Sequence, residues 1–206
     1  MKKSNFILII FAVIVLGGLL VYGKYYYQKT TDVDKDNQVI AFAQGFVVGN
    51  PDAPVVVEEF MSYLCGHCLN FTNDTFPPLK EKYVDSEQVQ FHVFVMPPVE
   101  LSAAALCAAD QNNFLAFHDY FTGHVASELK TADDIKIMTQ KSGLDMALFN
   151  ECYDSDKFSA TLAAWDKIYQ QKNVTSTPTF FVNGQLISGN QPINVFESAI
   201  DQALGK

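Results

Sequence analysis

The sequence predicts an α/β fold in which a strand–helix–strand unit and a strand–strand–helix unit are separated by a block of helices. Runs rich in β-branched and aromatic residues stand at 55–61 and 89–95, and again at 179–182 and 185–188. Between the second and third runs, about 70 residues carry helical signals, which suits an inserted subdomain. Two strands joined through a helix usually pair in parallel, so 55–61 and 89–95 are expected to lie side by side.

The N-terminal segment 1–29 is predicted to be a signal anchor or a signal peptide. Two lysines precede an uninterrupted apolar run at 6–22, and three tyrosines follow it at 25–27. The run is short for a membrane span but long for the apolar core of a signal peptide, and no A-x-A cleavage site follows it. We therefore favour an uncleaved anchor in the inner, cytoplasmic membrane, with the lysines holding the N-terminus inside. The rest of the chain is then expected at the extracytoplasmic face, or soluble in the periplasm if the segment is cleaved.

The next two segments lead into the first half of the fold, at 49–98. Residues 30–48 are expected to form a linker, because their first part is polar and charged. A dense turn cluster at 49–54 introduces the first strand. The helix after that strand is expected to be kinked or divided at Pro77-Pro78.

The helical insertion is predicted at 99–172. Its alanine-rich run at 103–109 is a strong helix former, and further helices are expected at 131–140 and 158–171. Aromatic side chains recur at helical spacing, which we interpret as core packing rather than as a cofactor site. No cofactor is predicted.

The second half is predicted at 173–206. Asn183-Gly184 is a strong signal for a tight hairpin between the last two strands, and a closing helix is expected at 196–204. A formal net charge of −9 disfavours nucleic acid as a partner, and 17 Phe with 9 Tyr argue against disorder.

The reactive element of the sequence is Cys65-Gly66-His67-Cys68, placed where the first strand turns into a helix. Unsatisfied N–H groups and the helix dipole favour a thiolate on Cys65, and His67 can add a donor or a positive charge. Such surroundings lower a thiol pKa from about 8.5 to between about 3.5 and 7.5. Cys65 is therefore the candidate attacking sulfur, and Cys68, one turn further on, the shielded resolving sulfur.

Two other uses of this cysteine pair remain open, a structural disulfide and half of a zinc site. A zinc site needs a second ligand pair of similar spacing, whereas Cys107 and Cys152 are single residues far apart. The histidines at 92, 118 and 124 show no metal-binding spacing, so they are assigned no role and no metal is predicted.

The order of these features resembles the thioredoxin fold with a helical insertion. The matching residues are Glu59-Phe60 before the cysteine pair, the helical block, Thr177-Pro178-Thr179 and Asn183-Gly184. Over about residues 45–204 the chain is similar to the DsbA-type thiol:disulfide oxidoreductases, and within them to the membrane-anchored, BdbD-like branch.

The resemblance implies roles for three further residues. Pro178 matches the proline that is cis in this fold, and Thr177 would offer backbone groups to an extended substrate; an ordinary trans proline is the alternative. Glu59 matches the family's buried acid, which can relay a proton to or from Cys68. Strand alternation turns Glu58 and Glu59 to opposite faces, and we choose Glu59 on its register relative to Cys65.

The resemblance also implies that Cys107 and Cys152 can bridge two helices of the insertion. In an exported chain with four cysteines, that bridge is favoured over two free, buried thiols.

The function these expectations favour is an exported oxidoreductase that introduces disulfides into reduced client proteins. The family implies a membrane redox partner that reoxidises the cysteine pair. Gly66 and Thr177 depart from the strongest oxidases, so an isomerase or reductase kept reduced by a membrane electron donor stays open. Isomerases usually dimerise through an extra domain, for which only the short linker is available, so a monomer is expected. A copper(I) carrier that binds the metal through Cys65 and Cys68 is the alternative of a different class.

Overall fold

The computed structural model describes residues 17–18, 21–22 and 42–206. The chain divides into two units, Met1–Val39 and Ile40–Lys206, and the fold is that of the second unit. The predicted signal anchor or signal peptide at 1–29 lies outside the described residues, apart from the helical pairs 17–18 and 21–22. Among the described residues, no helix has the length and apolar character needed to cross a membrane.

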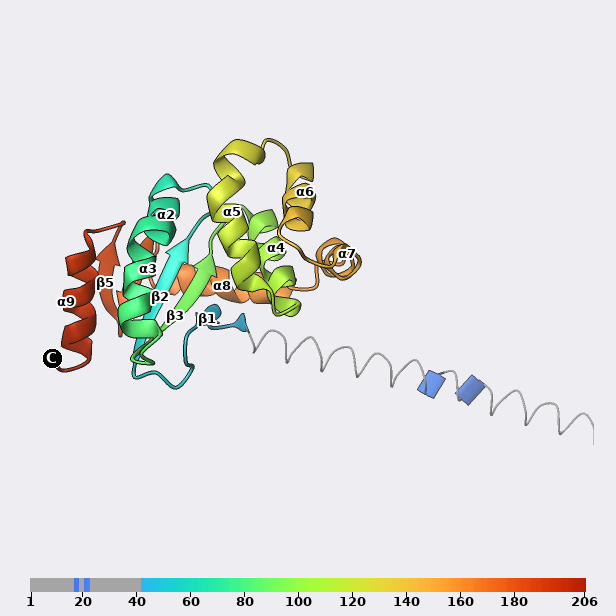
Figure 1. Ribbon diagram of the computed structural model, residues 1–206. Coiled ribbons are helices and arrows are strands. Elements are labelled where there is room, and N and C mark those ends of the chain that lie inside the picture. Colours follow the sequence, from blue (N-terminus) through green and yellow to red (C-terminus); the bar gives the residue numbers. More distant parts are fainter. Residues whose placement is uncertain (1–16, 19–20, 23–41) are drawn as a thin grey trace, which may run out of the picture. The chain divides into compact units, whose positions relative to one another are not determined.

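A five-stranded sheet in the order β1-β3-β2-β4-β5 forms the centre of the described part of the chain (Figure 1). The central pair, β2 and β3, is parallel, as predicted for two strands joined through a helix, and the other three pairings are antiparallel. The strands are β1 (Phe46–Val48), β2 (Val55–Met61), β3 (Val89–Val95), β4 (Thr179–Val182) and β5 (Gln185–Ser188). The four strands expected from the sequence are confirmed with their predicted bounds.

Strand β1 corrects the prediction that residues 30–48 are a linker. Phe46 and Val48 are buried and Val47 is exposed, so the segment alternates as an edge strand does. The Phe46 ring stacks on Phe114 with centroids 3.9 Å apart and meets Trp165 edge-on. The linker was predicted from the polar residues in the first part of the segment. Its apolar end forms a strand because side chains of the helical insertion pack against it.

One face of the sheet is covered by the helix that follows β2 and by the C-terminal helix. The first is built from α2 (Gly66–Asn70), the π-helical turn η1 (Phe71–Thr75), α3 (Phe76–Leu79) and a second π-helical turn η2 (Lys80–Val84). Pro77 and Pro78 stand in the first turn of α3, where their missing N–H groups are tolerated, so the helix is divided here as the sequence predicted.

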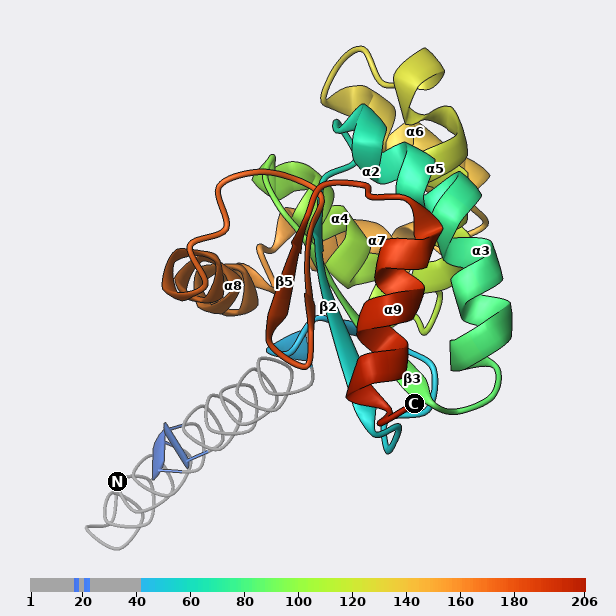
Figure 2. The ribbon, with the colours of Figure 1, turned by 90° about the vertical axis from the view of Figure 1, so that its left-hand side faces the viewer.

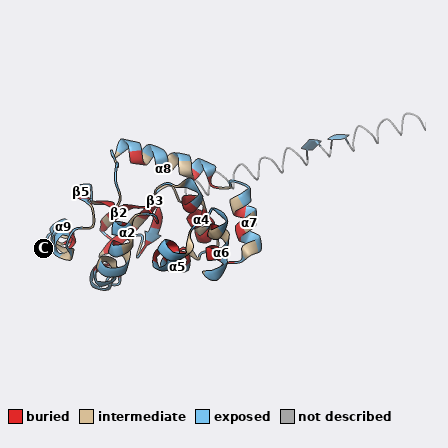
Figure 3. Cartoon of the chain, turned by 90° about the horizontal axis from the view of Figure 1, so that it is seen from above, coloured by how far each residue is buried: buried red, intermediate tan, exposed pale blue. Residues whose placement is uncertain are grey.

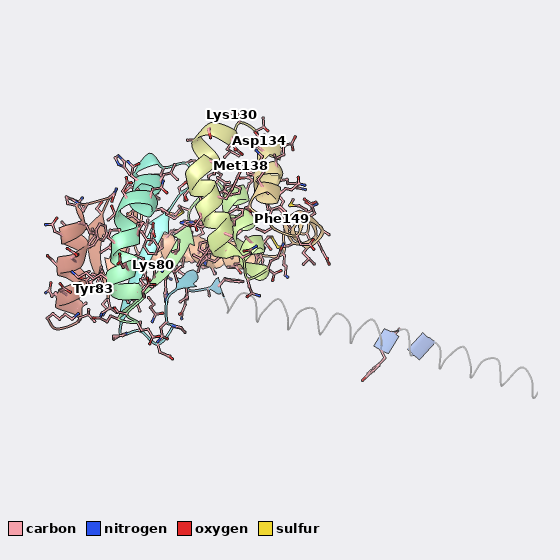
Figure 4. The ribbon with its side chains drawn as sticks, in the orientation of Figure 1. Lys80, Tyr83, Lys130, Asp134, Met138 and Phe149 are labelled. Atoms are coloured by element: carbon pink, nitrogen blue, oxygen red, sulfur yellow. A yellow bond between two sulfur atoms is a disulfide. The ribbon has the colours of Figure 1, made fainter. Side chains whose placement is uncertain are left out.

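The C-terminal helix α9 (Ile193–Ala203) packs beside α3 on this face (Figure 2). The Phe71, Phe180 and Phe196 rings pack together between the helices and the sheet. At the lower end of the first helix, Figure 4 labels Tyr83. Its hydroxyl donates to Asp201 of α9 at 2.9 Å. The helix begins three residues before the predicted start at Phe196, because Pro192 precedes its first turn.

The helical insertion covers the other face and one end of the sheet. It consists of α4 (Val99–Asp110), α5 (Phe114–Glu128), α6 (Asp133–Lys141), α7 (Met146–Asp154) and α8 (Ser159–Gln171). Helix α8 lies across the sheet face opposite α3 and α9, where Trp165 and Tyr169 pack on Phe94 (Figure 2). Helix α4 is largely buried, whereas α7 and α8 each leave one side exposed (Figure 3).

Hydrogen bonds at the start of α6 and buried side chains of α6 and α7 order this part of the insertion. Asp134 accepts hydrogen bonds from the backbone N–H groups of Lys130 and Thr131, which orders the start of α6 (Figure 4). Met138 and Phe149 are fully buried and belong to the core. The predicted architecture, an α/β sheet with an inserted helical subdomain, is therefore confirmed.

Candidate active site

The cysteine pair lies at the C-terminal edge of the parallel strands, where β2 gives way to α2. Cys65 has an extended backbone and caps the helix, and its carbonyl accepts the N–H groups of Cys68 and Leu69. Both thiols are free, so the structure presents the dithiol form. The strand-to-helix placement predicted from the sequence is confirmed.

Cys65 is the reachable sulfur of the pair. It is half-buried, and its Sγ donates to the backbone carbonyl of Thr177 at 3.2 Å. Burial alone would raise its pKa. Hydrogen bonds with the side chains of Thr177 and Cys68, and from the backbone N–H groups of Cys68 and His67, outweigh burial and lower the pKa of the Cys65 thiol. A thiol of this kind is a good nucleophile and a good leaving group near neutral pH.

Cys68 has the opposite character. Its side chain is completely buried, and burial raises the pKa of its thiol far above the ordinary value. The backbone N–H of Ser62 donates to its Sγ at 3.5 Å, which works against that rise. The two sulfurs therefore differ in both access and acidity, which a disulfide exchange site requires.

His67 is exposed on the first turn of α2. It acts on Cys65 through its backbone N–H, which is one of the donors that lower the pKa of that thiol. The sequence indicated that the His67 imidazole could lower the pKa of Cys65. In the structure the backbone N–H of His67 has this effect.

Glu59 and Glu58 face opposite sides of the sheet, as strand alternation predicted. Glu58 binds Lys172 in an ion pair of 2.7 Å. Glu59 is 4% exposed, and its Oε1 has no hydrogen-bond partner among the described residues. Burial raises the pKa of this carboxyl to about 8, so it is mostly protonated at neutral pH.

A cavity of about 220 Å³ adjoins Glu59 on the face covered by α3. Phe76 and Val93 form part of its apolar wall, and His118 and Asp119 bring polar atoms from the insertion. A buried acid beside such a space can exchange a proton without moving the backbone.

Thr177 and Pro178 meet the cysteine pair from the other half of the fold. The Thr177–Pro178 peptide bond is cis, and Thr177 lies against Cys65 through its carbonyl. The Pro178 carbonyl accepts the N–H of Gly189 at 2.9 Å, which ties this loop to the end of β5. The loop is thus held beside the reactive sulfur, the place that the resemblance gave it.

Two side chains that support the site, Ser62 and His118, were not found from the sequence. Ser62 is in contact with Cys68, as described above. His118 is buried in α5, and its Nδ1 lies 3.1 Å from the hydroxyl of Tyr63, two positions before Cys65. Burial lowers the pKa of His118 to about 4, so it is neutral. The only sequence signal was a histidine within an aromatic stripe, which did not reveal its partner.

Cys107 and Cys152 are joined by a disulfide between α4 and α7, with Cα atoms 5.8 Å apart. This is the pairing that the resemblance implied. Among the described residues, no cluster of three or more His, Cys, Asp or Glu side chains is arranged to hold a metal ion.

Comparison with known proteins gives consistent matches over the same region. The family model described as "Thioredoxin" matches residues 42–202. A "Putative protein-disulfide oxidoreductase" of Rickettsia felis is 32% identical over an alignment of 166 residues that covers 77% of this chain and 59% of that protein. This chain therefore spans about six tenths of the length of that relative. A "Probable disulfide bond formation protein D" of Bacillus anthracis is 28% identical and matches over the full length of both chains.

Solved structures share the fold. Oxidised BdbD from Bacillus subtilis aligns with a TM-score of 0.71 at 22% identity, covering 80% of this chain and 94% of that one. The structure of alpha-DsbA1 from Wolbachia pipientis aligns with a TM-score of 0.69 at 22% identity, covering 77% of this chain and 90% of that one. The fold described above is thus shared with these proteins.

Proposed function

Because the chain belongs to the thioredoxin family, as a DsbA-type thiol:disulfide oxidoreductase, we propose that it introduces disulfides into exported proteins through Cys65 and Cys68. The observation that carries the proposal is the contrast between the two sulfurs. Cys65 is reachable and has a lowered pKa, whereas Cys68 is buried and has a raised one. Relatives named for disulfide bond formation support the same direction.

The reaction starts from the oxidised Cys65–Cys68 pair. A client thiolate attacks Sγ of Cys65, the bond between the two cysteines breaks, and its electron pair passes to Sγ of Cys68. That sulfur has a high pKa and takes up a proton. Glu59 is the proposed proton donor, since its carboxyl is largely protonated at neutral pH.

A second client thiolate then attacks the client sulfur of the mixed disulfide. The client disulfide forms, and Cys65 leaves as a thiolate. The hydrogen bonds that lower the pKa of Cys65 stabilise this leaving group, which favours release of an oxidised client. Thr177 and Pro178 are proposed to align the client backbone beside the sulfur during both steps.

Location and partners follow from this chemistry. We place the domain on the extracytoplasmic side, with residues 6–22 as the anchor and residues 30 to about 45 as the tether. The Cys107–Cys152 disulfide suits an oxidising compartment. A membrane redox partner is needed to reoxidise the dithiol, and the chain is proposed to act as a monomer.

The test of this function is oxidation of a reduced, unfolded client such as ribonuclease. The wild-type protein is expected to restore activity to the client in a stoichiometric burst, and Cys65→Ser is expected to abolish it. Cys68→Ser is the matched variant: it keeps the nucleophile, and its Cys65 thiolate should attack a disulfide-bonded client, releasing one client sulfur as a thiolate. The mixed disulfide should then accumulate, because no Cys68 thiol remains to resolve it. A Cys65→Ser protein with full activity would contradict the proposal.

The direction of transfer is decided by the reduction potential of the cysteine pair. A potential of about −120 mV supports a disulfide donor, and a potential of about −270 mV supports a reductase. Tight, stoichiometric copper(I) binding without any client oxidation would instead favour the carrier.

A further inference from the structure

Ser62 occupies the first position after β2, directly beside the buried sulfur of the pair. Its backbone N–H donates to Sγ of Cys68 with an N···S distance of 3.5 Å. Ser62 is 7% exposed and Cys68 is completely buried, so water does not compete freely for this contact. The N–H therefore points at the atom that receives the electron pair when the Cys65–Cys68 bond breaks.

The side chain of Ser62 holds that N–H in place. Its hydroxyl donates to the carbonyl of Pro97 at 3.2 Å and accepts the N–H of Leu64 at 3.3 Å. The Ser62 carbonyl also accepts the N–H of Cys65 at 3.1 Å. The hydroxyl thus ties the loop after β3 to the loop that carries the reactive sulfur, and residue 62 is fixed between them.

We propose that the Ser62 N–H stabilises the Cys68 thiolate as it leaves, and that the Ser62 hydroxyl is the positioning group that aims this N–H. The inference rests on the proposed function in one respect: Cys68 must be the leaving group of the first step. An N–H donor binds an anionic sulfur more strongly than a neutral disulfide sulfur, so the contact favours the transition state over the starting state.

The surroundings of Cys68 make such a donor valuable. Burial opposes negative charge on this sulfur, and the Ser62 N–H is the backbone donor that offsets it. The proton from Glu59 completes the step once the sulfur carries charge. The N–H assists bond breaking, and the carboxyl neutralises the product.

The experiment measures reduction of the oxidised protein by dithiothreitol, whose first step is attack at Cys65 with departure of Cys68. Wild type, Ser62→Ala and Ser62→Thr are mixed with excess dithiothreitol and quenched in acid at successive times. The free thiols are then alkylated, and mass spectrometry gives the fraction of reduced protein. Ser62→Ala keeps the N–H but removes the hydroxyl that aims it. The substitution is expected to lower the second-order rate constant roughly five- to tenfold, about the effect of weakening one hydrogen bond. Ser62→Thr retains the hydroxyl and is expected to recover the rate to within about twofold, since one hydrogen bond is preserved.

A second measurement separates this role from general loosening of the loop. In a Cys68→Ala protein that carries glutathione on Cys65, dithiothreitol releases the mixed disulfide without any departure of residue 68. Ser62→Ala is expected to leave this rate unchanged. An equal slowing in both reactions would overturn the proposal, as would an unchanged rate in the first.

The same data distinguish failure of this inference from failure of the proposed function. Attack by dithiothreitol requires no client protein. If the wild type oxidises no client but Ser62→Ala still slows the first reaction alone, the proposed function is wrong and the role of Ser62 stands.

Discussion

Sγ of Cys65 lies 3.2 Å from the carbonyl oxygen of Thr177, although 112 positions separate the two residues in the chain. The contact joins the strand–helix–strand half of the fold to the strand–strand–helix half. It forms because β2 and β4 are neighbours in the sheet, which brings the loops at their ends together. The reactive sulfur is therefore positioned by the completed sheet rather than by its own loop alone.

The two thiols are expected to differ in reactivity towards iodoacetamide. In the reduced protein at pH 6–7, Cys65 should react at least about tenfold faster than Cys68, because it is more accessible and has the lower pKa. Peptide mapping by mass spectrometry after short exposure measures both rates. The control is Cys65→Ser, in which Cys68 should stay unmodified; similar labelling of both cysteines in the wild type would contradict the assignment.

Glu59 is expected to make the protein less stable as the pH rises from about 4.5 to about 8. The folded-state pKa is raised, so the native state holds the proton over a range in which the unfolded chain releases it. The stability present below pH 4.5 is lost on the way to pH 8, with an amplitude on the order of 5 kcal/mol for this single group. Urea unfolding of the reduced protein at several pH values measures it.

Glu59→Gln is the matched variant for that measurement. The amide does not titrate, so the free energy of unfolding should lose this decline between pH 4.5 and 8. The comparison concerns the slope with pH, because a buried amide has its own desolvation cost. Parallel curves for the two proteins would show that the carboxyl titrates normally.

His118 is expected to act in the opposite direction over a lower window. Burial lowers its folded-state pKa from 6.5 to about 4, so the unfolded chain binds the proton first as the pH falls. Stability should therefore be lost from pH 6.5 down to pH 4. In a His118→Gln protein this loss should be absent, as urea unfolding across that range will show.

The pH ranges in which Glu59 and His118 change the free energy of unfolding overlap between pH 4.5 and 6.5. In that range the two changes have opposite sign. Above pH 6.5 His118 no longer opposes the decline caused by Glu59. The Cys65 thiol, whose pKa is lowered, works against the decline in the wild type and in Glu59→Gln alike. The wild-type protein should thus lose stability on the alkaline side of neutrality, whereas Glu59→Gln should keep its stability there. A wild type that gains stability from pH 6.5 to 8 would contradict this combination.

The sequence was sufficient for four of the five strands of the sheet and for the reactive pair, but not for β1 or for the contacts that complete the site. Strands β2 to β5 were predicted with their observed bounds because each carries a clear run of β-forming residues between turn signals. Ser62 and His118 could not be predicted, since their partners Pro97 and Tyr63 lie 35 and 55 positions away. Such pairings depend on how the insertion and the loops pack, which periodicity does not encode.

The Cys107–Cys152 disulfide is expected to stabilise the insertion without taking part in catalysis. It closes a loop of 45 positions, for which chain entropy gives about 4 kcal/mol. The double variant Cys107→Ala/Cys152→Ala should lose about that much free energy of unfolding in urea and still oxidise a client. Loss of client oxidation in a fully folded double variant would mean that the bridge acts on Cys65.

Phe46 tests whether β1 is part of the folded core, as the structure has it, or the end of a linker, as the sequence indicated. The ring is buried between Phe114 and Trp165, so Phe46→Ala should cost about 3–5 kcal/mol of unfolding free energy. Val47→Ala is the matched control, because Val47 is 45% exposed on the same strand and its truncation should cost less than about 0.5 kcal/mol. Trp165 is the single tryptophan of the chain, so its fluorescence should also report loss of the Phe46 ring in the folded state. If both substitutions lowered the free energy of unfolding by equal, small amounts, residues 46–48 would belong to the linker and not to the core. Helix α8 would then anchor the insertion without β1.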